Sequence, residues 1–211
     1  KRVALQFPEG LLLFSTPLCD IFERFGVFLG ATIRHRIEDG KNTSWALVTM
    51  ASVGAVEDAL AAWRWFREQP FTRHLVGGDS AGGNLAAVVC QHAETKPGGQ
   101  LLIYPACDFD RTRPSYVENA EGPLLRVANM KATNAMYCPD ETMLTTDPRI
   151  APLAADSHAG LPPAYVAVAH NDPLRDSGLA YADALERAGV AVTREPGEGL
   201  IHGYLRAMEY C

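Results

Sequence analysis

The chain has 211 residues, a net charge of −6 and a sequence pI of about 5.5. Hydrophobic residues make up 47% of it and charged residues 21%, which is typical of a globular domain that buries its own core. The acidic balance argues against a nucleic-acid-binding protein and against a polybasic module that docks on membranes. No apolar run reaches the roughly 18–20 residues that a membrane-spanning helix needs, so we expect no stable membrane insertion.

Short apolar runs, mostly continuous rather than alternating, predict strands that are buried on both faces of a parallel sheet. In chain order they lie at residues 3–7, 31–33, 74–77, 100–104, 164–169 and 190–194. Apolar residues at three- to four-residue steps and flanking stop signals predict helices at residues 53–69, 82–93 and 177–188. This alternation indicates an α/β fold with a mostly parallel sheet and helices on both faces.

Residues 107–156 interrupt the alternation. They are rich in Pro, Asn, Asp and Arg, and their helical patterns are short. We interpret them as an insertion that covers an active site as a lid; a surface excursion without a catalytic role is the alternative. Residues 1–52 form an atypical N-terminal segment, and the chain length favours a single domain over residues 1–211.

Five cysteines are scattered along the chain, and no two of them form a C-x-x-C pair. They are Cys19, Cys90, Cys107, Cys138 and Cys211. Their odd number and irregular spacing fit neither a disulfide framework nor a zinc site. We therefore expect buried, reduced thiols and a cytoplasmic location, in keeping with the lack of a signal-peptide pattern after Lys1.

The most informative motif is Gly78-x-Ser80-x-Gly82, which lies between a predicted strand and a predicted helix. On such a sharp turn the residues two positions either side of the serine must be small, because their backbones approach closely. The turn projects the serine hydroxyl out of the sheet and turns the amide of Ala81 toward an oxyanion on the substrate. The alternative is a glycine-rich turn that packs closely and does no chemistry.

A serine nucleophile needs a base and an orienting acid, which follow it in the order Asp or Glu, then His. Asp172 comes just after the strand at 164–169, and His202 lies in a glycine-rich loop after the last strand. Loops beyond the carboxyl ends of parallel strands meet at one edge of the sheet. The sequence therefore predicts a catalytic triad of Ser80, Asp172 and His202.

Each predicted partner has an alternative. Asp172 could be a helix N-cap, and Asp176 is a nearby carboxylate that could be confused with it. His202 could be a structural loop residue, and His170 is a rival base. The remaining histidines, for which a surface or core position is expected, are His35, His74, His92 and His158.

Residues 77–86, with the sequence Gly-Gly-Asp-Ser-Ala-Gly-Gly-Asn-Leu-Ala, resemble the nucleophile motif of the bacterial hormone-sensitive-lipase-like esterases. Residues 172–176 and 201–204 are similar to the acid and histidine motifs of that family. Further similarity lies at residues 57–65, 121–125 and 147–153, so that the resemblance covers about residues 53–211.

This resemblance implies an α/β-hydrolase fold, truncated at the N-terminus, and a serine carboxylesterase that works through an acyl-enzyme. It implies a small-molecule ester with a short- to medium-chain acyl group as substrate, and no metal or organic cofactor. The oligomeric state is left open between a monomer and a homodimer.

The N-terminal quarter departs from the family pattern. A His-Gly-Gly-Gly loop donates oxyanion-hole amides in the family, and residues 7–11 take its place here with only Gly10 in common. We expect the amides of Glu9 and Gly10 to join that of Ala81, since such donors are backbone groups. The alternative is a catalytically impaired small-molecule binding module with a defective oxyanion hole.

Residues 2–28 resemble the start of the iron–sulfur enzymes of diphthamide biosynthesis. The cluster-binding cysteines of those enzymes have no recognisable counterparts here. An iron–sulfur enzyme is therefore less favoured than a serine carboxylesterase or a binding module. Residues 34–52 resemble neither family.

Overall fold

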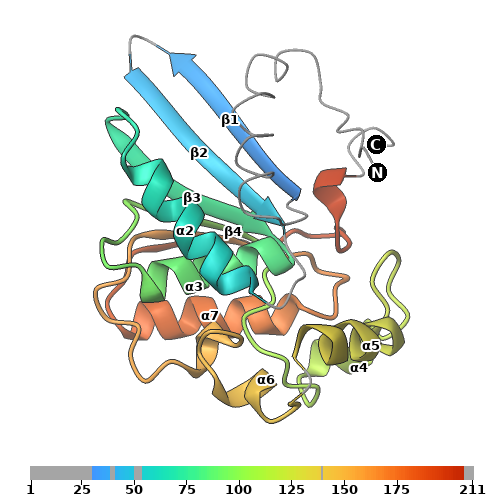
Figure 1. The fold of residues 1–211 in the computed structure, drawn as a ribbon. Coiled ribbons are helices and arrows are strands. Elements are labelled where there is room, and N and C mark those ends of the chain that lie inside the picture. The colour runs from blue at the N-terminus through green and yellow to red at the C-terminus, as the bar shows by residue number, and fades with distance from the viewer. Residues whose placement is uncertain (1–29, 39–40, 50–53, 139, 207–211) are drawn as a thin grey trace, which may run out of the picture.

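The computed structural model describes residues 30–38, 41–49, 54–138 and 140–206 (Figure 1). Six strands form one sheet in chain order: β1 Gly30–Glu38, β2 Lys41–Thr49, β3 Arg73–Asp79, β4 Gln100–Ile103, β5 Ala164–Ala167 and β6 Val192–Glu195. β1 pairs with β2 in antiparallel fashion, and the other neighbouring pairs are parallel. The predicted fold class, α/β with a mostly parallel sheet, is confirmed.

Three helices connect the parallel strands: α2 Ala55–Arg67, α3 Ala81–His92 and α7 Arg175–Arg187. Each lies within two residues of its predicted bounds. Because successive strands lie side by side in chain order, right-handed crossovers place these helices on the same face of the sheet (Figure 1). The other face carries the short 3-10 helix η3, Tyr204–Arg206, which packs beside Ile103 and Ala167.

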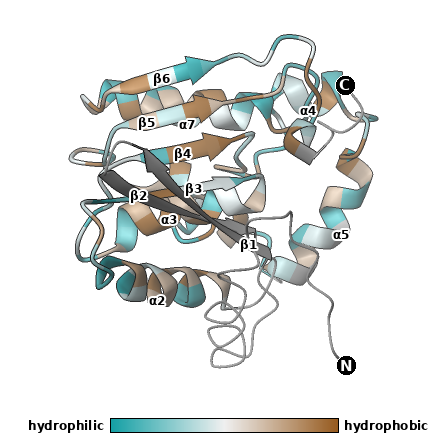
Figure 2. Ribbon diagram, turned by 90° about the horizontal axis from the view of Figure 1, so that it is seen from above, coloured by the Kyte–Doolittle hydropathy of each residue, from teal (hydrophilic) through white to brown (hydrophobic). Residues whose placement is uncertain are grey.

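The main core lies between the sheet and the three connecting helices. Leu102 of β4 and Val166 of β5 meet Leu85 of α3 and Leu185 of α7 there, and all four side chains are almost fully buried. Figure 2 shows hydrophobic residues along β4, in the middle of the parallel strands. This packing makes the parallel strands and their helices a firm support for the loops at the carboxyl edge.

The insertion leaves the sheet after β4 and returns before β5. It forms the helices α4 Pro114–Glu118, α5 Val127–Tyr137 and α6 Met143–Thr146, and the 3-10 helix η2 Pro152–Ala154. α4 and α5 lie beyond the carboxyl ends of the strands (Figures 1 and 2). That edge of the sheet is where the sequence predicts the triad.

The N-terminal strands match the sequence prediction least well. Residues 31–33 fall in β1, which is longer than predicted, whereas β2 was not predicted at all. The predicted strand at residues 3–7 lies outside the described residues. Within the described part of the chain, no helix combines the length and the apolar character needed to cross a bilayer.

Candidate active site

Ser80 occupies a sharp turn between β3, which ends at Asp79, and α3, which begins at Ala81. Its backbone has a φ of 56°, in the left-handed region that residues other than glycine rarely adopt. The Ser80 amide donates a hydrogen bond of 2.9 Å to the carbonyl oxygen of Ile103, which fixes the turn to the neighbouring strand. Such strain persists only where the surroundings impose it, and it is common at functional sites.

The glycines around Ser80 allow this turn to form. A Cβ atom on Gly78 would overlap the carbonyl group of Gly82, and one on Gly83 would lie 2.9 Å from the Cβ of Pro105. The backbones of β3 and α3 therefore touch at Gly78 and Gly82, and α3 packs closely on the chain after β4 at Gly83. This close approach of the two backbones is the steric requirement that the G-x-S-x-G pattern predicts.

We expect Gly78→Ala to lower the free energy of unfolding by about 3 kcal/mol, because the new methyl group overlaps backbone that cannot move aside. Urea denaturation of the variant and the wild type measures the difference. Gly98→Ala is a matched control, since its Cβ meets its nearest neighbour at 3.4 Å, an ordinary contact distance. Equal midpoints for Gly78→Ala and the wild type would contradict the steric account.

Two loops bring the predicted acid and base together. Asn171 and Ile201 form a parallel β-bridge, and the Asn171 amide donates to the carbonyl oxygen of Leu200 at 2.9 Å. Asp172 follows Asn171 and His202 follows Ile201. The bridge therefore aligns the backbones of the acid and the base, which are 30 residues apart in the chain, so that their side chains meet.

The three residues of the predicted triad form one hydrogen-bonded line. His202 Nδ1 lies 2.7 Å from Asp172 Oδ2, and His202 Nε2 lies 3.0 Å from Ser80 Oγ. The Asp172 side chain is fully buried, and its other oxygen accepts the Leu174 amide at 2.9 Å. Asp172 therefore holds the turn before α7 as well as meeting His202, but it is not a helix N-cap, because the N-cap of α7 is Leu174.

An aromatic wall supports His202. The ring of Tyr104 packs against the imidazole with 4.8 Å between ring centroids, and Tyr204 meets Tyr104 edge-on at 5.1 Å. The Tyr104 hydroxyl donates to Asp79 Oδ2 at 3.2 Å. Neither Tyr104 nor Asp79 was predicted to contribute. The position of Asp79 next to Ser80 was a signal for Asp79, whereas the sequence held none for Tyr104.

The rival groups lie apart from this line. The His170 side chain is 51% exposed, and its Nδ1 lies 3.8 Å from a carboxylate oxygen of Glu198. Asp176 binds the Arg175 guanidinium at 2.9 Å and accepts the Ser115 amide at 2.8 Å. Burial raises the pKa of Asp176, but these hydrogen bonds outweigh it and leave the pKa below its ordinary value. Of the candidate bases, His202 is the one that contacts Ser80, and of the candidate acids, Asp172 is the one that contacts His202.

The described cysteines are poor candidates for a nucleophile. Cys90, Cys107 and Cys138 are buried and unpaired, as predicted, whereas Cys19 and Cys211 lie outside the described residues. Burial raises the thiol pKa of Cys90 and of Cys107 well above the ordinary value. Since the thiolate is the reactive form, neither thiol competes with Ser80.

Of the predicted oxyanion donors, the structure describes one. The Ala81 amide lies in the first turn of α3, where amides lack intrahelical acceptors and the helix dipole favours negative charge. Glu9 and Gly10 lie outside the described residues.

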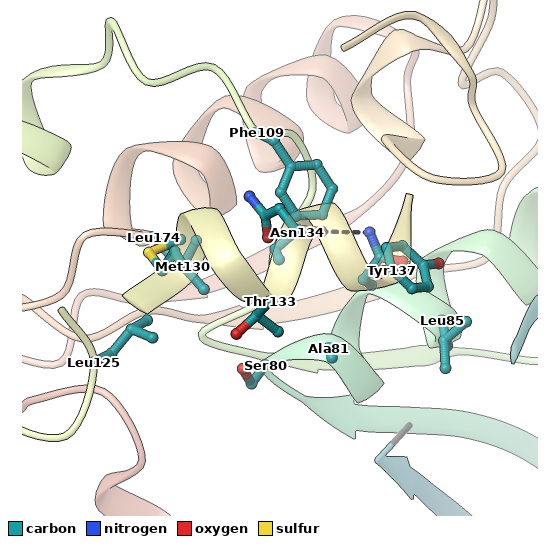
Figure 3. A pocket seen from close by; sticks show the side chains of 12 residues that line it. Ser80, Ala81, Leu85, Phe109, Leu125, Met130, Thr133, Asn134, Tyr137 and Leu174 are labelled. Atoms are coloured by element: carbon teal, nitrogen blue, oxygen red, sulfur yellow. Dashed lines mark hydrogen bonds between the residues drawn. The ribbon is translucent and has the colours of Figure 1, made fainter. Parts of the chain in front are cut away.

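A pocket of about 130 Å³ opens beside Ser80 and Ala81 (Figure 3). One wall is the start of α3, and α5 of the insertion forms the facing wall, through Met130, Thr133 and Asn134. Most of the lining is apolar, so the pocket suits the carbon skeleton of a small molecule next to the serine hydroxyl.

Residues 53–206 match the family model of the alpha/beta hydrolase fold, and the chain belongs to that family. It is 42% identical over 161 residues to Esterase LipI of Mycobacterium tuberculosis. The match covers 72% of this chain and 50% of LipI. It is 41% identical over 165 residues to Carboxylesterase NlhH of the same organism, covering 71% of this chain and 51% of NlhH. The chain thus spans about half the length of the curated relatives it matches.

Among solved structures, the ester-hydrolase EH1AB1 from the metagenome of Lake Arreo is similar, with a TM-score of 0.67 and 44% identity. The match covers 74% of this chain and 52% of EH1AB1. The Pyrobaculum calidifontis esterase matches with a TM-score of 0.71 and 32% identity, over 80% of this chain and 61% of that one. The resemblance to esterases is therefore supported, whereas nothing in the comparisons bears on the diphthamide-like segment at residues 2–28.

Proposed function

We propose that the chain is a serine carboxylic-ester hydrolase that acts on small esters with short- to medium-chain acyl groups. The observation that carries this proposal is the hydrogen-bonded line from Asp172 through His202 to Ser80. The names of the relatives, which are esterases and carboxylesterases, support the same reaction. The partner is then a small-molecule ester.

In the proposed acylation step, Ser80 Oγ attacks the ester carbonyl carbon while His202 Nε2 takes the hydroxyl proton. The distance of 3.0 Å between these atoms suits that transfer. Asp172 accepts a hydrogen bond from His202 Nδ1–H, which holds the imidazole in the required tautomer and stabilises the imidazolium that forms. His202 then returns the proton to the leaving alcohol, and the serine retains the acyl group.

The negative charge on the carbonyl oxygen needs preorganised donors. We assign the Ala81 amide to this role, with the amides of Glu9 and Gly10 as the proposed second group. Water activated by His202 then attacks the acyl-enzyme, releasing the acid and restoring Ser80. Helix α5, which lies across the pocket from Ser80, is the proposed lid.

The test is hydrolysis of p-nitrophenyl acetate and p-nitrophenyl butyrate by the purified chain. We expect saturable release of p-nitrophenol above the rate with heat-denatured protein. The alternative, an impaired binding module, predicts no turnover but retained binding of an uncleavable ester analogue. Absence of saturable turnover would therefore overturn the proposal.

A further inference from the structure

Asn134 is one of the polar residues that interrupt the mostly apolar lining of the pocket beside Ser80, together with Asn84, Thr133 and Tyr137. The side chains of Leu85, Phe109, Met130 and Leu174 form much of the pocket wall, and the Asn134 amide lies among them (Figure 3). Asn134 is 7% exposed, and its amide is not among the fully buried polar atoms that lack a partner, so the amide keeps some accessible surface. Once a ligand fills the pocket, such an amide needs hydrogen-bond partners.

The protein does not supply these partners within the described residues. The backbone carbonyl of Asn134 accepts the Cys138 amide, but its side chain forms no hydrogen bond with any described residue. Asn84, the other asparagine of the pocket, differs, because its side-chain amide donates to the carbonyl oxygens of Ala106 and Ile150. Asn84 is thus a structural residue, whereas the amide of Asn134 is available to whatever occupies the pocket.

The acyl side of an ester is the part that fits this pocket. His202 must lie within hydrogen-bond reach of the leaving alcohol oxygen in order to protonate it. His202 is not among the residues that line the pocket, whereas Ser80 and Ala81 are. The alcohol therefore lies toward His202, and the acyl chain extends along α3 toward Asn134.

The size of the pocket limits that chain. Its volume is about 130 Å³, and an apolar cavity of about 150 Å³ holds one benzene molecule. Acyl groups of about six carbons or fewer thus fill the pocket without displacing α5. A polar atom on so short a chain comes close to the Asn134 amide.

We propose that Asn134 is a specificity-determining residue that selects esters whose short acyl chain carries a hydrogen-bonding oxygen, such as an oxo, hydroxy or ether group. This inference rests on the proposed ester hydrolysis. An amide offers two donors and an acceptor, so it binds such an oxygen. An ester of the same shape with a carbon atom in place of that oxygen leaves the Asn134 amide buried without a partner, so the enzyme disfavours it.

The experiment uses two pairs of p-nitrophenyl esters of matched shape: 4-oxopentanoate with 4-methylpentanoate, and methoxyacetate with butanoate. The ratio of kcat/KM within each pair is measured for the wild type and for Asn134→Leu, which keeps the branched shape and the number of non-hydrogen atoms of the side chain. Dividing the wild-type ratio by the variant ratio cancels the intrinsic reactivity of the esters. We expect a quotient of about ten in favour of the oxygen-bearing ester for at least one pair.

Asn129→Leu, which changes an exposed asparagine of the same helix, should leave both ratios at the wild-type value. Quotients near one for both pairs would overturn the role of Asn134. If Asn134→Leu does not fold, the wild-type ratios divided by those for hydroxide-catalysed hydrolysis replace the quotient, with the same two readings. Failure of the wild type to hydrolyse any of the four esters would instead overturn the proposed function.

Discussion

Ser80→Ala is expected to lower kcat/KM for p-nitrophenyl butyrate by about 10⁵-fold or more, the scale of loss for removing a serine nucleophile. Without the hydroxyl no acyl-enzyme can form, although the pocket and the Ala81 amide remain. The position already carries a φ of 56°, which the alanine must adopt as the serine does. Circular dichroism and the thermal midpoint should therefore stay near those of the wild type.

Ser157→Ala is the control for this experiment, because Ser157 is exposed and its hydroxyl oxygen accepts the local Ala159 amide. Its kcat/KM should equal that of the wild type. Retention of more than a few per cent of activity by Ser80→Ala would place the nucleophile elsewhere in the chain.

Asp172→Asn is expected to lower kcat by about 10⁴-fold with little change in KM. The substitution nearly keeps the shape of a fully buried side chain, so the loops should remain aligned. An amide N–H facing His202 Nδ1 favours the tautomer whose proton is on Nε2, which cannot accept the Ser80 proton. Steady-state kinetics with p-nitrophenyl butyrate measures the loss.

Asp176→Asn is the matched control, since Asp176 binds Arg175 and Ser115 rather than His202. We expect its kcat to remain within about threefold of the wild type, because remote contacts of this kind are worth little in the transition state. The reverse order of effects, with Asp176→Asn the more damaging variant, would make Asp176 the orienting acid.

The triad of Ser80, Asp172 and His202 could be predicted from the sequence, because each residue has a recognisable local context. The spacing Gly78-x-Ser80-x-Gly82 reports a steric requirement, and the contact between Gly78 and Gly82 is that requirement. Asp172 and His202 were placed by a topological rule, namely that loops after parallel strands converge at one edge. Their catalytic roles remain a proposal that the kinetics above test.

Features that depend on tertiary packing were harder to predict. Strand β2 begins with polar residues, Lys41 to Ser44, but its second half, Trp45 to Val48, is an apolar run, so the sequence held a signal for it that the prediction missed. Tyr104 is inconspicuous in the sequence, because its role depends on a loop about 100 residues away that brings His202 onto its ring. The amide of Asn134 gains its meaning only from the apolar side chains that surround it.

Of the proposed oxyanion donors, the structure describes the amide of Ala81, which lies at the start of α3. Glu9, Gly10 and the segment resembling diphthamide-biosynthesis enzymes lie outside the described residues. The prediction that Glu9 and Gly10 complete the hole therefore stands as made. A backbone donor of this kind is worth about 2.7–4 kcal/mol of transition-state stabilisation, so the measured kcat reports on it directly.

Covalent labelling with an alkyl fluorophosphonate, followed by tryptic digestion and mass spectrometry, tests the central claim most directly. The reagent phosphonylates a serine only where a neighbouring base removes its proton. The tryptic fragment of residues 74–111 contains Ser80 as its sole serine. We predict stoichiometric label on this fragment, and its loss in His202→Ala and after heat denaturation. Label confined to another fragment, or an unlabelled chain that still hydrolyses p-nitrophenyl butyrate, would contradict the assignment of Ser80, His202 and Asp172 as one proton-transfer line.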